Sequence, residues 1–187
     1  MLQMIMPFAI AILIGYLIGC FNLALIISKM KKVDLRNTGT KNLGASNTFI
    51  TFGKGLGVLV GVCDIFKCTL VIILVKLIFP DIDYLPYITG LACILGHMFP
   101  FYLKFKGGKG FASFVGMTLG INWKFFIVIG ICIILITLIT KYIVLATMAQ
   151  SLVIQSFYSS ILTTGGLFQW LPLYHVLLLS IIKILFA

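Results

Sequence analysis

The sequence predicts an all-α membrane protein, a polytopic helix bundle with about seven spans. Of its 187 residues, 61% are hydrophobic, only 10% are charged, and none is glutamate. A water-soluble domain normally carries about 25% charged residues, so this chain has too few polar side chains to cover a surface in water. Residues 1–28 and 125–140 contain no charged residue, as expected of segments that face lipid.

The apolar segments and the polar loops between them define the expected spans. We expect spans at Gln3–Ser28, Gly55–Phe79, Leu85–Leu103, Phe111–Ile121, Phe125–Thr140, Tyr142–Leu162 and Trp170–Phe186. The fourth is short for a span; alternatively, it is re-entrant, with its ends buried in protein or hydrated. No charge precedes Lys29, which makes the first segment a retained span, not a cleavable signal peptide. We expect residues 1–187 to form a single integral-membrane domain.

The basic residues are distributed unequally between the two sides of this arrangement. Most of them fall in the loops 29–54 and 104–110, whereas the other side carries few. Because cytoplasmic loops accumulate Lys and Arg, we expect both loops and the C-terminus in the cytoplasm and the N-terminus outside. The net charge of +10 follows from this rule and from attraction to anionic membrane lipid. No nucleic-acid partner is predicted, because no soluble basic domain carries the charge.

The cysteines and the overall pattern exclude some classes of protein. The five cysteines lie in apolar segments without a CxxC pair, so they are expected to be packing residues and no metal site is predicted. No convincing inverted repeat is present, which argues against a transporter.

The first loop with possible chemistry is 39–47, which is rich in Gly, Asn, Ser and Thr. Glycine lets the backbone approach a ligand closely, and successive N–H groups can form an anion-binding site. The alternative is an ordinary loop of turn residues. The candidate phosphate-binding residues in this loop are Gly39, Thr40, Lys41, Asn42, Gly44 and Asn47.

The second loop is basic and glycine-rich, and it precedes the fourth apolar segment. A helix N-terminus at this position favours phosphate. The Walker A pattern is not met, because position 103 is leucine and position 110 is glycine, so nucleotide hydrolysis is not expected. The alternative is a loop that only contacts lipid headgroups, although the glycines would serve little purpose there. The candidate phosphate-binding residues are Lys104, Gly107, Gly108, Lys109 and Gly110.

Three further titratable residues lie within expected spans. His97 is the only candidate for a catalytic residue; it could be a base, a phosphate donor or a structural side chain, and the sequence assigns no base. Asp64 and Lys67 are three residues apart, on one helix face, at membrane depth. We expect a structural pair that neutralises charge, since a single pair makes a poor relay for the alternative, a proton or ion path.

These motifs resemble the bacterial acyl-phosphate:glycerol-3-phosphate acyltransferase family over residues 14–142. Residues 96–110 match nearly all of its pattern G-H-x-F-P-x-[YF]-x-x-F-K-G-G-K-G, and Asp64 and Lys67 match its D-x-x-K. Its first motif, roughly G-S-x-N-x-G-A-[TS]-N, is met at Gly39, Asn42, Gly44, Ala45, Ser46 and Asn47.

The resemblance implies a seven-span enzyme of phospholipid biosynthesis with its active site on the cytoplasmic side. It would transfer an acyl chain from acyl phosphate to the 1-hydroxyl of glycerol 3-phosphate, giving lysophosphatidic acid and phosphate. No metal, coenzyme A or other cofactor would be needed. We expect a monomer, surrounded by lipid, in the bacterial cytoplasmic (inner) membrane.

The sequence departs from the family at several polar positions. Thr40 replaces a serine, Lys41 a glycine, Ile50 an arginine and Val144 a serine, and the C-terminal pattern H-R-x-N-I has no counterpart. One hypothesis is that Lys41 restores the charge lost at Ile50. The alternative function is that of a divergent, weakly active or non-catalytic paralogue that acts as an anionic-lipid carrier or regulator.

Overall fold

The computed structural model describes residues 2–140, and within this range all regular structure is helical. The chain divides into two compact units, up to Ile121 and from Asn122 onward. The expected sixth and seventh spans and Val144 lie outside the described residues. In the second unit, α7 (Trp123–Thr140) begins two residues before the expected fifth span, because the Asn122 side chain accepts a hydrogen bond from the Lys124 N–H at 3.0 Å.

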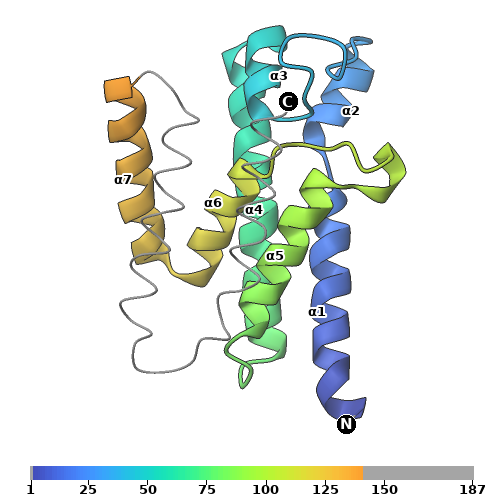
Figure 1. The fold of residues 1–187 in the computed structure, drawn as a ribbon, viewed down its shortest axis with the longest axis vertical. Coiled ribbons are helices and arrows are strands. Elements are labelled where there is room, and N and C mark those ends of the chain that lie inside the picture. The colour runs from blue at the N-terminus through green and yellow to red at the C-terminus, as the bar shows by residue number, and fades with distance from the viewer. Residues whose placement is uncertain (1, 141–187) are drawn as a thin grey trace. The chain divides into compact units, whose positions relative to one another are not determined.

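The first unit contains the helices that position the two polar loops (Figure 1). Three stretches are long and apolar enough to cross a membrane, namely Ile5–Met30, Lys54–Ile78 and Leu85–Leu103, among the residues described. The helices are α1 (Leu2–Cys20), α2 (Leu23–Met30), α3 (Ala45–Phe52), α4 (Lys54–Ile78), α5 (Leu85–Met98), the 3-10 helix η1 (Phe101–Leu103) and α6 (Phe111–Ile121).

The expected first span agrees with the apolar stretch Ile5–Met30, but the helix breaks within it, between α1 and α2. Asn22 has extended backbone angles (φ −133°, ψ 102°), and its side-chain oxygen accepts a hydrogen bond from the Leu25 N–H at 2.9 Å. An Asn oxygen in this position replaces the backbone acceptor that a continuous helix would use. A single polar residue in an apolar segment therefore starts a new helix.

The expected polar loop 29–54 also contains a helix that the sequence did not predict. Helix α3 begins after Gly44 and ends at Gly53, which has a φ of 95°. It lies directly against α4, because a Cβ built at Gly57 would be 2.4 Å from the Cβ of Phe49. Contact with α4 stabilises a helix whose polar composition was read as a loop.

Close helix packing in this unit depends on glycines spaced four residues apart. A Cβ at Gly19 of α1 would lie 2.1 Å from the carbonyl oxygen of Cys93 in α5, and a Cβ at Gly116 of α6 would lie 2.1 Å from the carbonyl oxygen of Ile65 in α4. Gly15 and Gly19 form one such pair and Gly116 and Gly120 another. Small residues at this spacing let helix backbones approach in membranes, where packing drives association.

Helix α6 has 11 residues, which corresponds to a length of about 16 Å, half the thickness of a bilayer core. Its last carbonyl groups have no hydrogen-bond partners within the helix. The Lys76 ammonium of α4 donates to the carbonyl oxygens of Gly120 and Ile121 at 2.9 and 2.8 Å. Lys76 thus caps α6, and this contact explains a lysine inside an apolar helix.

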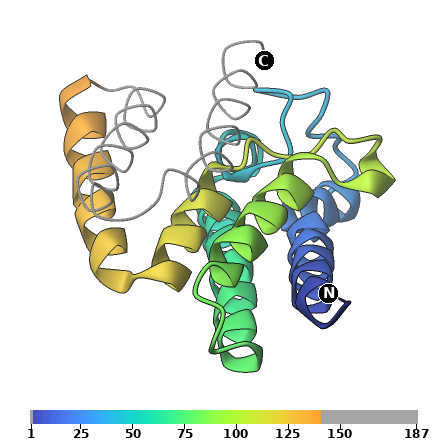
Figure 2. The same ribbon diagram turned by 60° about the horizontal axis from the view of Figure 1, so that its bottom comes forward.

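Both polar loops lie at the same end of the first unit, and the N-terminus of α1 lies at the opposite end (Figures 1 and 2). At this end, an apolar cluster of Ala24, Leu25, Ile27, Leu35, Leu43 and Val60 is buried. Leu35 and Leu43 belong to the polar segment 29–54, which contains the first loop, and Leu103 of η1 packs against the same cluster. The two loops therefore share one support.

Replacing Gly19 tests the close packing of α1 on α5. Gly19→Val places a branched side chain against the Cys93 carbonyl, and we expect the free energy of unfolding to fall by about 1–3 kcal/mol, as for other overpacked sites. Thermal unfolding in detergent measures the change. Gly55→Ala is the matched control, because a Cβ there meets nothing within 4 Å; equal melting temperatures for both variants would contradict the packing role.

Candidate active site

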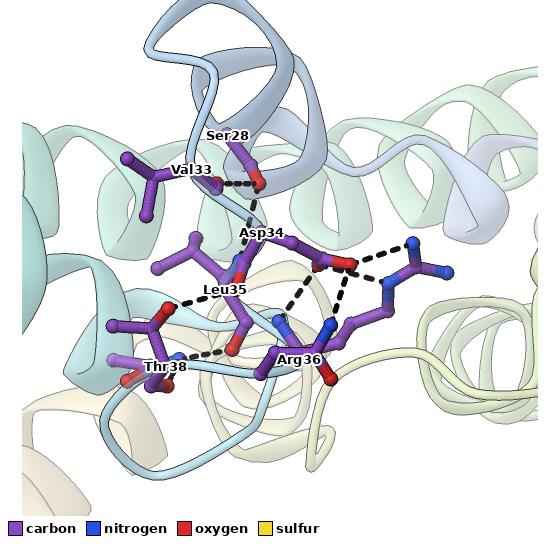
Figure 3. A network of polar contacts seen from close by, with 8 residues as sticks. Ser28, Val33, Asp34, Leu35, Arg36 and Thr38 are labelled. Atoms are coloured by element: carbon purple, nitrogen blue, oxygen red, sulfur yellow. Dashed lines mark hydrogen bonds and ion pairs between the residues drawn. The ribbon is translucent and has the colours of Figure 1, made fainter.

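Side chains brace the turn that follows α2 (Figure 3). The Ser28 hydroxyl donates to the Val33 carbonyl at 2.5 Å and accepts from the Leu35 N–H at 3.2 Å. The Asp34 carboxylate accepts hydrogen bonds from the Arg36 backbone N–H and guanidinium, each at 3.0 Å. These contacts hold the chain in the tight turn that leads into the first loop.

The hydrogen bonds from Arg36 hold the pKa of Asp34 below its ordinary value. The carboxylate is therefore ionised at neutral pH, and its contribution to stability is lost only as the pH falls through the lowered pKa. Both side chains are exposed, at 48% for Arg36 and 37% for Asp34. Exposed pairs contribute about 0.2–1 kcal/mol, so this pair is a minor brace.

The buried amide of Asn47 organises the first loop from inside. Its oxygen accepts from the Thr40 N–H at 2.8 Å, and its nitrogen lies 2.7, 3.0 and 2.9 Å from the carbonyl oxygens of Leu35, Thr38 and Asn42. The residue is fully buried in the first turn of α3. Its side chain is engaged by the protein's own backbone, so Asn47 acts here by shaping the loop.

The edge of this loop exposes the residues that could meet a ligand. Gly39 has a left-handed φ of 58°, and a Cβ there would be 2.3 Å from the Asn47 oxygen, so only glycine fits. Thr40 and Lys41 follow and are exposed. Lys41 has a φ of 52°, which is uncommon for a residue with a side chain and which glycine adopts readily.

The second loop folds back onto the end of α5. The N–H groups of Gly107 and Gly108 donate to the carbonyl oxygens of Met98 and His97, each at 3.0 Å. Two of the backbone N–H groups expected to hold an anion are therefore bonded within the protein. The first N–H groups of α6 remain outside the helical hydrogen bonds, since that ladder starts with Phe114 donating to the Gly110 carbonyl.

The structure distributes the predicted phosphate-binding residues between surface and interior. The exposed members are Gly39, Thr40, Lys41 and Lys104, the half-buried ones Asn42, Gly107 and Lys109, and the buried ones Gly44, Asn47, Gly108 and Gly110. The surface members include two lysines, one from each loop. Sequence reasoning missed Ser113 of α6, whose buried hydroxyl has no hydrogen-bond partner in the described part of the chain.

Asp64 and Lys67 meet a third buried side chain, His97, below the loops. The Lys67 ammonium lies 2.8 Å from an Asp64 carboxylate oxygen, 2.9 Å from His97 Nδ1 and 2.7 Å from the Phe21 carbonyl oxygen. His97 Nδ1 is 3.4 Å from the same carboxylate oxygen. The sequence gave no reason to join His97 to this pair, because the residues lie on different helices.

Hydrogen-bond chemistry gives Lys67 the role of donor in this group. An ammonium group has three protons and no lone pair, and three acceptor atoms surround the Lys67 nitrogen: an Asp64 carboxylate oxygen, the Phe21 carbonyl oxygen and, in the tautomer with a bare Nδ1, His97. Among residues 2–140, no group of three or more His, Cys, Asp or Glu side chains is placed to hold a metal ion.

Comparison with known proteins gives the family. The family model described as glycerol-3-phosphate acyltransferase matches residues 9–186, and the chain belongs to this family. Glycerol-3-phosphate acyltransferase 1 of Oceanobacillus iheyensis is 36% identical over 188 residues, covering 96% of this chain and 87% of that protein. The resemblance read from the two loop motifs is confirmed.

Two crystal structures of PlsY, an integral membrane glycerol 3-phosphate acyltransferase, have the same fold. The glycerol 3-phosphate form is 28% identical with a TM-score of 0.78, and the lysophosphatidic acid form is 26% identical with a TM-score of 0.76. Each comparison covers 96% of this chain and 86% of the other. The all-helical integral-membrane class predicted from the sequence agrees with these neighbours.

Removing the Asn47 amide tests its role in shaping the first loop. Asn47→Ala leaves the Thr40 N–H and several carbonyl groups without their partner, and we expect the free energy of unfolding to fall by about 1–3 kcal/mol. Thermal unfolding in detergent measures the loss. Ser46→Ala, at an exposed neighbouring position, is the control; if both variants melt like the wild type, Asn47 does not hold the loop.

Proposed function

We propose that this protein transfers an acyl chain from acyl phosphate to the 1-hydroxyl of glycerol 3-phosphate, in phospholipid biosynthesis. The observation that carries the proposal is the support of two lysine-bearing loops by one apolar cluster at one end of the bundle. Membership of the glycerol-3-phosphate acyltransferase family and the glycerol 3-phosphate form of PlsY support the choice of acceptor. The lysophosphatidic acid form supports the product.

The reaction needs little chemistry from the protein because the donor is already activated. The acceptor hydroxyl attacks the acyl carbonyl carbon, an ester bond forms, and the bond from that carbon to the phosphate oxygen breaks. The hydroxyl proton passes to the phosphate that leaves. Lys41, Lys104 and Lys109, together with the N-terminal N–H groups of α6, would bind the phosphates of donor and acceptor. Orientation of the substrates and stabilisation of the oxyanion would supply the rate.

The proposed setting is the cytoplasmic (inner) membrane of a bacterium, with one domain over residues 1–187. The chain would cross it in seven spans, with the N-terminus outside and the C-terminus and active site on the cytoplasmic side, as a monomer surrounded by lipid. The distribution of lysines supports this orientation. The acyl chain of the donor would stay in lipid while its phosphate reaches the loops.

A second candidate function is binding of anionic lipids without catalysis. Ile50, where the family motif has arginine, is 63% exposed on α3, so the surface beside the first loop lacks one cation. A carrier or regulator would still bind phosphate headgroups but would form no ester.

Acyl transfer by the purified protein separates these functions. We expect radiolabelled lysophosphatidic acid from glycerol 3-phosphate with acyl phosphate and not with acyl-CoA. Lys104→Ala removes a charge-assisted phosphate contact, worth about 1.5–3 kcal/mol, and should lower kcat/KM at least tenfold. Product from neither donor, with folded protein, would refute the acyltransferase proposal and leave the lipid-binding one.

Two variants of one residue separate the charge of Lys41 from its backbone conformation. Lys41→Ala and Lys41→Gly both remove the ammonium group, so both should raise KM for a phosphate-bearing substrate about tenfold. Glycine suits the left-handed backbone, so Lys41→Gly should be the more stable of the two by about 1 kcal/mol. Wild-type KM in Lys41→Gly would mean that the charge does not replace the missing arginine.

A further inference from the structure

We propose that Asp64, Lys67 and His97 form a positioning network that holds the glycine-rich loop 104–110 in its phosphate-binding conformation. The inference rests on the proposed function and adds to it. It assigns a role in substrate binding to an intramembrane charge pair that the sequence suggested was only structural.

The network begins at the break between α1 and α2. The Leu25 N–H bonds to the Asn22 side chain, so the Phe21 carbonyl loses the partner it would have in a continuous helix. Lys67 supplies that partner from α4, at 2.7 Å. An unsatisfied carbonyl at membrane depth costs several kcal/mol, so this contact fixes Lys67 against the break.

Lys67 in turn fixes the His97 ring. Its contact with Nδ1 at 2.9 Å holds the orientation of the imidazole. Asp64 balances the charge of the ammonium at 2.8 Å. The three side chains are 3–6% exposed, and such burial restricts each of them to one arrangement.

The last step joins His97 to the glycine-rich loop. The Gly108 N–H donates to the His97 carbonyl at 3.0 Å, and a Cβ on Gly108 would be only 2.0 Å from His97 Nε2. The Gly108 backbone therefore rests on the imidazole. A ring that turned would push the loop and displace its lysines, Lys104 and Lys109, which lie on either side of this contact.

His97 acts in this arrangement as a positioning residue, which its variants can distinguish from a base. His97→Asn keeps an acceptor for Lys67 near the position of Nδ1, whereas His97→Leu removes it. If the network positions the loop, His97→Asn keeps its activity within about threefold of the wild type and keeps the wild-type pH profile. His97→Leu should lose activity by more than this. Loss of all activity in His97→Asn would overturn this role.

Two variants test the network: the single variant Lys67→Met, and the double variant that combines Asp64→Asn with Lys67→Met. The single change leaves a buried carboxylate unpaired and could prevent folding, whereas the double change removes both charges. Lys76→Met is the matched control, because it also removes an intramembrane lysine of α4 that donates to carbonyl groups, but at the end of α6.

Two measurements on the full chain in detergent decide the proposal. Inorganic phosphate is the probe of the site, and we expect its inhibition constant to rise about tenfold in the double variant with kcat within threefold. Trypsin probes the loop itself: cleavage after Lys104, Lys106 and Lys109, relative to cleavage in 29–54, should accelerate about tenfold. Lys76→Met should lower the melting temperature but change neither the phosphate inhibition constant nor the relative rate of trypsin cleavage.

The two readouts separate the failure of this inference from failure of the proposed function. An inactive wild type would refute acyl transfer, and the trypsin pattern would still decide whether the network holds the loop. An active wild type whose double variant keeps both the phosphate inhibition constant and the trypsin pattern would overturn the inference alone. Equal acceleration in Lys76→Met would also overturn it, since the effect would then reflect general loosening.

Discussion

The break in the first span imposes the constraint on which the rest of the first unit depends. Where α1 ends, the carbonyl groups of Cys20 and Phe21 lose their helical partners at membrane depth, where water cannot replace them. Tyr102 of η1 donates to the Cys20 oxygen at 2.5 Å, and Lys67 of α4 donates to the Phe21 oxygen at 2.7 Å. The position of the break therefore determines where α4 and η1 must lie.

The same break also places the first loop. Asn22 uses its oxygen to start α2 and its nitrogen to donate to the Leu43 carbonyl at 3.1 Å. One side chain thus ends a helix, begins another and fixes the loop 39–47. Together with Tyr102, it connects both loops to the end of α1, so the two halves of the candidate site are held by the same few hydrogen bonds.

Sequence reasoning recovered what depends on composition and missed what depends on contacts. The bounds of α4 and α6 were predicted to within one residue, because an apolar stretch between polar residues is a local signal. The effect of Asn22 could not be read locally, since an asparagine breaks a helix only where Leu25 and Leu43 offer partners. Likewise, His97 lies 30 residues from Lys67, and only the packing of α5 on α4 brings them together.

In the first loop, the residues that match the family motif and those that depart from it occupy different places in the structure. Gly39 and Asn47 match the motif and build the loop from inside, through a left-handed turn and a buried amide. Thr40 and Lys41 depart from it and lie on the exposed edge. Lys41 has a left-handed backbone conformation, with a φ of 52°, which glycine adopts more readily. In this loop, the residues that match the motif build the frame, and the two that depart from it lie where a ligand can meet them.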